Sequence, residues 1–308
     1  MSEGLAVRLR PTKLSQVIGQ EAAVETLKGL AKNGFPHFML FTGPSGCGKT
    51  TLARIVTDRL GCHANDFDEV NAAKERGIDL VRGIEERWGY SGMGGDVRVW
   101  LIDEAHALTS DAQGAFLKML EDTKLHVYFI FCTTNPEKLK PTIRTRATTI
   151  DLKAVSAKHV GQLLEYAIEQ EGYETTEDVI EKIVDVAGGS PRKALVLLEQ
   201  VAGVEGEAKQ MSALVAADPS RDAIEIARAL MKPGTTWNQM AKILSSVEGI
   251  DDKSEGIRWL VLSYMSTIAL KGGKGAGRAV FIIDRFRDNF FDCKKAGLIA
   301  ACYECLEK

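Results

Sequence analysis

The chain has 308 residues, 45% of them apolar and 26% charged, which is typical of a folded globular protein with room for two or three domains. The formal net charge of −3 excludes a basic field over the whole molecule, so any nucleic-acid contact must come from local geometry. No apolar run is long enough to cross a membrane and no signal-peptide pattern opens the chain, so we expect a cytoplasmic protein without membrane contacts.

The first half of the chain is predicted to form a parallel α/β sheet. After an irregular stretch over 8–19 and a helix over 21–32, strand-like runs alternate with helices over 51–60, 77–88 and 110–121. The strands are expected at His37–Phe41, Phe67–Asn71, Arg98–Asp103, Val127–Thr133 and Thr148–Leu152. Several of them are apolar on both faces, so helices should cover both sides of the sheet. We assign residues 1–153 to this domain.

From Ser156 onward the pattern is helical only. Ser156 and Thr176 stand where helix N-caps are expected, and Ser190 followed by Pro191 marks the start of a third helix. We interpret residues 154–207 as a small helical lid domain.

Residues 208–308 are expected to form a third, all-helical domain that is rich in apolar residues. Apart from one pair of cysteines, its residues do not show the spacing of metal or cofactor ligands. Whether its helices pack on one another or on neighbouring chains stays open. Cys302 and Cys305 have metal-like spacing, but no second pair lies nearby, and residues three apart share one helical face. Reduced structural thiols are therefore favoured over a zinc site.

The sequence Gly43–Thr50 fits the pattern of a glycine, four residues, then Gly-Lys and Ser or Thr. Glycines allow the tight turns that point backbone N–H groups at anionic oxygens. Lys49 supplies a cation for the β and γ phosphates, and the Thr50 hydroxyl can ligate Mg²⁺. The strand before and the helix after favour a nucleotide site over an ordinary glycine-rich turn. Further contacts are expected from Ser45, Gly46, Cys47, Gly48 and Thr51.

A second motif ends the strand over 98–103, where apolar residues lead into Asp103 and Glu104. Two carboxylates at the carboxyl end of such a strand suit hydrolysis of Mg²⁺-bound ATP. Asp103 can hold the metal, and Glu104 can polarise the attacking water. The letters Asp-Glu-Ala-His also label a class of helicases, but the other motifs of that class are absent from the sequence.

Three further positions could belong to the same site. A polar side chain at Thr134 or Asn135, after the next strand, lies within reach of the γ-phosphate, although a plain strand-ending turn is the alternative. Arg146 precedes the last strand and could be solvated or reach into another subunit. Arg192 stands in the first turn of its helix, where the macrodipole disfavours a cation, and Lys193 shares that mismatch.

Taken together, these motifs resemble the AAA+ ATPase subunits of DNA polymerase clamp loaders, both the bacterial tau/gamma type and the small subunits of replication factor C. The resemblance covers about residues 8–205. Two departures stand out: the family's Ser-Arg-Cys reads Thr-Arg-Ala around Arg146, and the four-cysteine zinc module of the bacterial type is missing after Cys62.

The resemblance implies roles around a nucleotide. Val17 and Ile18 would line the adenine pocket. Either Thr134 or Asn135 would be the first sensor, and Arg192 would be the sensor of the lid. Lys49, Thr50, Asp103 and Glu104 keep the roles given above.

Other implied roles concern partners. Arg146 would be an arginine finger that acts in trans, and Asn71 would restrain the catalytic glutamate until DNA binds. Arg76, Arg82 and Arg87 would face template DNA, although acidic residues on the same helix keep a solvated face as the alternative.

We therefore expect an ATP hydrolase that uses ATP and Mg²⁺ to open a sliding clamp and place it on primer–template DNA, working with other clamp-loader subunits, in a pentamer by family resemblance. The alternative is another AAA+ remodeller, such as a helicase loader or branch-migration motor. A third class, a scaffold that binds ATP without hydrolysis, is disfavoured because Lys49, Asp103, Glu104 and Arg146 are all present.

Overall fold

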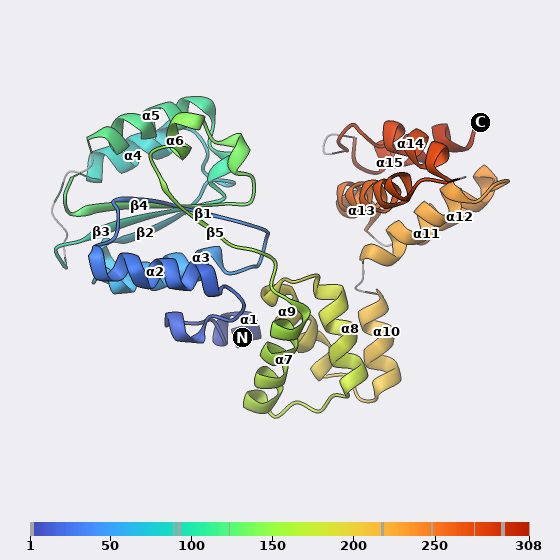
Figure 1. The fold of residues 1–308 in the computed structure, drawn as a ribbon, viewed down its shortest axis with the longest axis horizontal. Coiled ribbons are helices and arrows are strands. Elements are labelled where there is room, and N and C mark those ends of the chain that lie inside the picture. Colours follow the sequence, from blue (N-terminus) through green and yellow to red (C-terminus); the bar gives the residue numbers. More distant parts are fainter. Residues whose placement is uncertain are drawn as a thin grey trace. The chain divides into compact units, whose positions relative to one another are not determined.

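The structure is a computed structural model, and it describes residues 3–88, 90, 94–122, 124–216, 219–247, 249–273, 275–290 and 293–307. The chain divides into two compact units, unit 1 (Met1–Glu207) and unit 2 (Ala208–Lys308). Figure 1 shows the sheet and its helices in unit 1 and a group of helices in unit 2. The further division of unit 1 into a sheet domain and a lid remains a prediction.

Unit 1 contains a five-stranded sheet with the order β2-β3-β4-β1-β5, in which every observed pairing is parallel. The strands are β1 (Phe38–Thr42), β2 (Phe67–Asn71), β3 (Arg98–Asp103), β4 (Val127–Thr133) and β5 (Thr148–Asp151). The predicted α/β fold class is thus confirmed, and each strand lies within one residue of its predicted bounds. Because all strands run the same way, β1, β3 and β4 end at the same edge of the sheet.

Helices cover both faces of this sheet, as the apolar strands require (Figure 1). On β1, Met39 and Phe41 join the cluster under α2 (Glu21–Asn33) and α3 (Lys49–Arg59). Phe38 and Leu40 point the other way, into the cluster under α4 (Ile78–Trp88) and α5 (Ser110–Glu121). The alternation is the period of two that a strand imposes on its side chains.

Three helices in the predicted lid region complete unit 1: α7 (Ala157–Glu171), α8 (Glu177–Ala187) and α9 (Pro191–Ala202). Ser156 and Ser190 accept cap hydrogen bonds from the backbone N–H groups of His159 and Lys193. Thr176 occupies the N-cap position of α8, but its side chain makes no cap bond. Helix formation there does not depend on the predicted cap.

The N-terminal segment packs on the lid. A short helix, α1 (Leu5–Arg8), lies against α9, and the Leu5 backbone N–H donates to Glu199 Oε1 at 2.9 Å. Arg8 forms an ion pair with Glu171 of α7. The irregular stretch predicted for 8–19 contains one 3₁₀ turn, η1 (Leu14–Gln16). The segment therefore joins the start of the chain to the lid helices.

The remaining short elements of unit 1 are turns at the ends of strands. They are η2 (Ala64–Asp66), η3 (Ala105–Ala107), η4 (Pro136–Lys138) and α6 (Pro141–Arg144). Next along the chain, α10 (Glu207–Ala216) begins at the last residue of unit 1.

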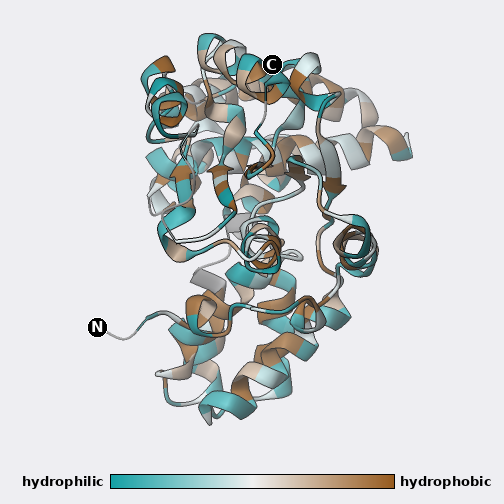
Figure 2. Cartoon of the chain, turned by 90° about the vertical axis from the view of Figure 1, so that its left-hand side faces the viewer, coloured by the Kyte–Doolittle hydropathy of each residue, from teal (hydrophilic) through white to brown (hydrophobic). Residues whose placement is uncertain are grey.

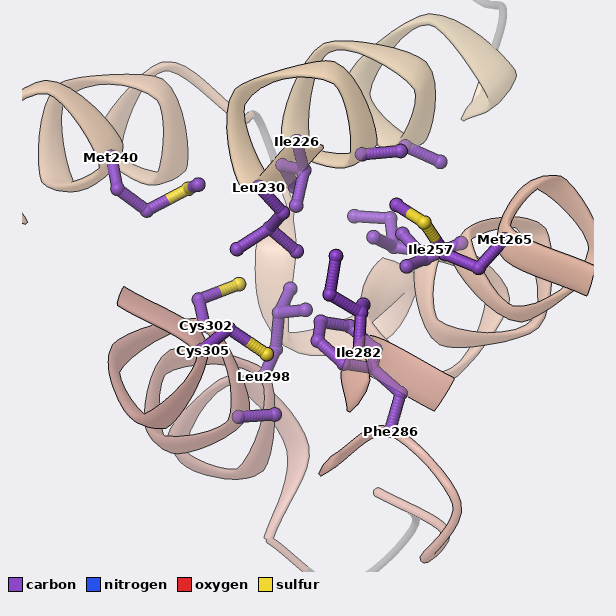
Figure 3. Packing of buried hydrophobic residues seen from close by; sticks show 14 of the residues in the cluster. Ile226, Leu230, Met240, Ile257, Met265, Ile282, Phe286, Leu298, Cys302 and Cys305 are labelled. Carbon is purple, nitrogen blue, oxygen red and sulfur yellow. The ribbon is translucent and has the colours of Figure 1, made fainter. Parts of the chain in front are cut away.

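Unit 2 buries one apolar cluster between its helices (Figure 3). The helices that form this cluster are α11 (Pro219–Met231), α12 (Trp237–Ser246), α13 (Ile250–Lys271), α14 (Ala276–Arg285) and α15 (Lys294–Leu306). Cys302 and Cys305 lie in this cluster, and burial raises the pKa of the Cys305 thiol to about 11 and that of Cys302 further. Both thiols therefore stay protonated at neutral pH.

Apolar and polar residues occupy different sides of many helices (Figure 2). This pattern is expected where a helix buries one face and solvates the other. Of the helices that the structure describes, none is both long and apolar enough to cross a membrane.

Candidate active site

Three glycines give the loop after β1 its shape. Gly43, Gly46 and Gly48 have φ angles of +136°, +72° and +110°, values that other residues rarely adopt. A side chain at Gly43 would collide with the carbonyl oxygen of Leu152, and one at Gly46 would collide with Ser190 Oγ. The backbone therefore needs glycine for conformation and for space.

Lys49 opens α3 and is only 6% exposed. Its Nζ donates to the backbone oxygens of Gly43 at 2.9 Å and Pro44 at 2.8 Å. Both acceptors are neutral, so neither cancels the charge of the ammonium group. A phosphate in the loop would supply the missing negative charge.

The Thr50 and Asp103 side chains meet where α3 and β3 approach each other. Thr50 Oγ1 donates to Asp103 Oδ2 at 3.0 Å, and Asp103 Oδ1 accepts the Glu104 N–H at 2.9 Å. A hydroxyl and a carboxylate oxygen side by side are hard ligands that suit Mg²⁺, with phosphate and water oxygens completing its shell. Within the described part of the chain no group of three acidic, histidine or cysteine side chains could hold a metal without such help.

Glu104 has an unusual backbone and an unusual carboxylate. Its φ of +51° and ψ of +40° lie in the left-handed region, which costs a residue other than glycine about 1–3 kcal/mol. The Oε2 atom is buried without a hydrogen bond, although His106 Nδ1 lies 3.3 Å away, an ion pair only if the imidazole is protonated. Whether His106 donates to this oxygen therefore depends on which ring nitrogen carries the proton.

A cavity of about 500 Å³ opens beside these residues, a volume that suits a nucleotide-sized ligand. The predicted residues Val17 and Ile18 lie in its wall, as do the loop residues from 45 to 51, Asp103 and Glu104. Residues of α1 and α9 complete the wall. The structure thus brings the sequence motifs together around one hollow within unit 1.

The cavity wall also contains Arg10, Arg54 and Glu69, which sequence reasoning did not assign to the site. Arg54 lies one turn after Thr50 and forms an ion pair with Glu69 at 2.7 Å. Burial lowers the pKa of Arg10, and the nearby positive charge of Arg54 lowers it further. The four-residue spacing to Thr50 could have identified Arg54, whereas Glu69 and Arg10 carry no comparable signal.

The two cations at the start of α9 differ in their surroundings. Arg192 is exposed and lies in the cavity wall. Lys193 instead donates its Nζ to the backbone oxygen of Val186 in the lid. The ambiguity between them in the sequence is thus reduced by geometry, although the sensor role of Arg192 remains a prediction.

The turn after β4 is organised by Thr133. This residue is fully buried, and its Oγ1 accepts the Asn135 N–H at 3.1 Å. Thr134 and Asn135 are half-buried and lie outside the cavity wall. Which of the two could sense the γ-phosphate stays open.

Arg146 and Asn71 also lie outside the cavity wall. The Arg146 guanidinium pairs with Glu121 at 2.6 Å and donates to the Thr142 backbone oxygen at 3.0 Å. Asn71 Oδ1 accepts the Ala73 N–H at 2.8 Å, so the bond found for it is local and does not involve Glu104. The predicted roles of both residues remain untested.

The three arginines predicted to face DNA have different surroundings. Arg87 pairs with Asp68 at 3.3 Å and stacks over the ring of Trp100 at 4.8 Å. Arg82 forms an exposed ion pair with Asp79, and Arg76 is exposed at the start of the segment. Of the three arginines, Arg87 therefore makes the most side-chain contacts within its own subunit.

Comparisons with known proteins match two family models to parts of this chain. The family model of the DNA polymerase III delta subunit matches residues 69–156, and that of magnesium chelatase subunit ChlI matches residues 13–79. DNA polymerase III subunit gamma/tau of Mycobacterium tuberculosis is 34% identical over 218 residues, which are 63% of this chain and 38% of that protein. The replication factor C small subunit of Methanosarcina barkeri is 35% identical over 204 residues, 64% of this chain and 61% of that protein.

Solved structures support the fold. A point mutant of RuvB from Thermotoga maritima superposes with a TM-score of 0.60 at 21% identity, covering 77% of this chain and 86% of that one. The chain spans 38% of the length of the gamma/tau relatives it matches. From the shared motifs, the cavity and these matches, we conclude that the chain is a relative of the AAA+ subunits of DNA polymerase clamp loaders and carries their nucleotide-binding fold.

Proposed function

We propose that the chain is an ATPase subunit of a sliding-clamp loader. The observation that carries the proposal is the Thr50–Asp103 contact of 3.0 Å beside Glu104, in the wall of a nucleotide-sized cavity. This arrangement supplies a phosphate loop, a place for Mg²⁺ and a carboxylate for water activation. The relatives are subunits of DNA polymerase III and of replication factor C by name, which supports clamp loading among the uses of this fold.

ATP would lie with its phosphates in the Gly43–Thr50 loop. Lys49 would leave the two loop carbonyls for the β and γ phosphates, gaining a charged partner in place of neutral ones. Thr50 and Asp103 would hold Mg²⁺, which neutralises charge on the phosphates during their transfer. Glu104 would polarise the attacking water, and Arg192 would approach from the lid.

Arg146 would act on the site of a neighbouring subunit. The support is that it lies outside the cavity wall of its own subunit and presents a 41% exposed side chain. Such an arginine requires an assembly, and the resemblance favours a pentamer that holds a clamp open around primer–template DNA. With these partners, the protein would work in the cytoplasm.

The other AAA+ remodellers are less supported. A branch-migration motor shares the fold, but the likeness is at 21% identity. Such a protein should carry a DNA-binding wing or a partner domain in the last third of the chain. The elements assigned in the described part of unit 2 are helices.

The test is stimulation of ATP hydrolysis. The chain is mixed with candidate clamps and primed DNA, alone and together with candidate partner subunits, and phosphate release is followed. Clamp and DNA together are expected to raise the rate above either alone, and Glu104→Gln controls for contaminating hydrolases. Hydrolysis that stays unresponsive in every combination would contradict clamp loading.

A further inference from the structure

His106 lies between Glu104, which follows β3, and Thr133, the last residue of β4. It belongs to η3, two residues after Glu104, and its side chain is 19% exposed. Its Nδ1 is 3.1 Å from Thr133 Oγ1 and 3.3 Å from Glu104 Oε2. One ring nitrogen thus faces both the end of β4 and the carboxylate that would activate water.

The Glu104 carboxylate would be stabilised by a hydrogen bond from this nitrogen. Its side chain is 34% exposed as a whole, yet Oε2 is buried without a hydrogen bond. Leaving a buried carboxylate oxygen without a donor costs free energy, so a nearby N–H has a strong effect on its orientation. A proton on Nδ1 would be within reach of this oxygen.

Thr133 competes for the same proton. Its hydroxyl already accepts the Asn135 N–H, and it can either accept from Nδ1–H or donate to an unprotonated Nδ1. If Nδ1 carries the proton, it can bond well to Thr133 or to Glu104, but not to both at once. If Nδ1 is unprotonated, its lone pair repels Oε2.

We propose that His106 is a positioning residue that carries its proton on Nδ1 and couples the turn after β4 to the catalytic carboxylate. A movement of Thr134 or Asn135 on contact with the γ-phosphate would change the bond that Thr133 makes. With that change the Nδ1–H group, which keeps its proton, exchanges its hydrogen bond between Thr133 Oγ1 and Glu104 Oε2 and so sets where the carboxylate points. The inference rests on the proposed ATPase function and deepens it.

Substitution at His106 tests the coupling in the full chain. His106→Asn places an amide N–H near the position of Nδ1–H, whereas His106→Leu keeps bulk and removes the donor. Because His106 lies outside the cavity wall, both variants should keep the KM for ATP. We expect the kcat of His106→Leu to fall about 10- to 100-fold, on the scale of a misplaced catalytic group, and that of His106→Asn to stay within about threefold.

A double-mutant cycle tests the route through β4. Thr133→Val removes the hydroxyl at similar volume. If the two residues act through one proton, the combined loss of kcat in the Thr133→Val, His106→Leu protein should be smaller than the product of the single losses. Multiplicative losses would overturn the coupling, as would equal losses for His106→Asn and His106→Leu. Nucleotide affinity measured on each variant identifies any that fails to fold.

A measurement without nucleotide separates this inference from the proposed function. In ¹⁵N-histidine spectra, the chain gives signals from five imidazoles, and His106→Asn identifies the one that belongs to residue 106. We expect the Nδ1–H form, with shifts that change in Glu104→Gln and in Thr133→Val. A proton on Nε2, or shifts that ignore both substitutions, would overturn the coupling. If the wild type does not hydrolyse ATP, the proposed function fails, while this spectrum still reports on His106.

Discussion

Lys49 of unit 1 and Arg258 of unit 2 are both buried cations, and their partners differ in charge. Lys49 of unit 1 is 6% exposed and bonds to two neutral loop carbonyls. Arg258 of unit 2 is 4% exposed and forms an ion pair with Glu255 at 2.6 Å, with a further bond to the Phe286 backbone oxygen. A buried charge without a counter-charge indicates a place for an anionic ligand, whereas a paired one supports the fold.

Lys49→Ala is the strongest test of this comparison. Removing the unbalanced cation should abolish measurable ATP binding while leaving the free energy of unfolding almost unchanged, because Lys49 loses only bonds to neutral carbonyls. Isothermal titration and thermal unfolding measure the two quantities. Lys28→Ala, on the exposed face of α2, is the control with normal affinity. Normal ATP affinity in Lys49→Ala would contradict the anionic site.

Arg258→Met should give the opposite result. It leaves the partly buried Glu255 carboxylate without its cation, and we expect a loss of folding free energy below the about 3–5 kcal/mol typical of a fully buried pair, because Glu255 keeps its bond from the Phe290 N–H. Nucleotide affinity should not change. Arg287→Ala removes a 69% exposed arginine and should be nearly neutral. Denaturant unfolding of unit 2 at pH 7 measures the difference, and equal stability of the two variants would break the comparison.

The same pair predicts a pH dependence. Burial alone would raise the pKa of Glu255, but its hydrogen bonds with Arg258 and the Phe290 N–H outweigh burial and lower it. A carboxylate whose pKa is lowered in the folded state stabilises the fold at pH values above its unperturbed pKa. That contribution is lost as pH falls below about 4.5, the unperturbed pKa. The stability difference between wild type and Arg258→Met should therefore shrink in acid.

Within unit 1, Glu104→Gln separates binding from chemistry. The amide cannot polarise water as the carboxylate does, so turnover should fall about 10²–10³-fold. ATP affinity should remain, because Lys49, Thr50 and Asp103 are untouched. Single-turnover hydrolysis and nucleotide titration check the two parts. Hydrolysis within about threefold of wild type would remove Glu104 from the mechanism.

Arg146→Ala should lower hydrolysis at least about 10²-fold without changing ATP affinity, the loss expected for one contact made only in the transition state. Mixing it with Lys49→Ala should restore some activity, since a mixed interface joins a working loop to a working arginine. Co-assembly of the two variants is checked first by size. Glu121→Gln, which removes the local partner of Arg146, is a control with an intact arginine. A co-assembled mixture without activity would rule out action across the interface.

The smallest effect is expected for the arginines of α4 and its approach. Replacing Arg76, Arg82 and Arg87 by alanine should weaken stimulation by primed DNA a few-fold and flatten its salt dependence, because fewer counterions are released. Since Arg87 pairs with Asp68, Arg76→Ala with Arg82→Ala should account for most of the change. An unchanged salt dependence would indicate that these arginines form a solvated helix face that does not contact DNA.

Local patterns predicted most of the fold, because strand periodicity and glycine turns depend on neighbouring residues. The five strands and the loop at Gly43–Thr50 follow from such patterns. Contacts between distant segments could not be predicted. Glu69 reaches the site only because β2 lies beside β3, and His106 meets Thr133 across 27 residues of sequence.

The contact between Gly46 and Ser190 has a thermodynamic consequence. Ser190 Oγ, at the N-cap of α9, occupies the space where a side chain at position 46 would lie, so the phosphate loop and the lid share one surface. If a nucleotide shifts the lid by reshaping this loop, then fixing the lid changes nucleotide affinity by the same factor. A partner that binds only the lid would thereby act as an allosteric effector of the ATP site, raising or lowering its affinity without entering the cavity.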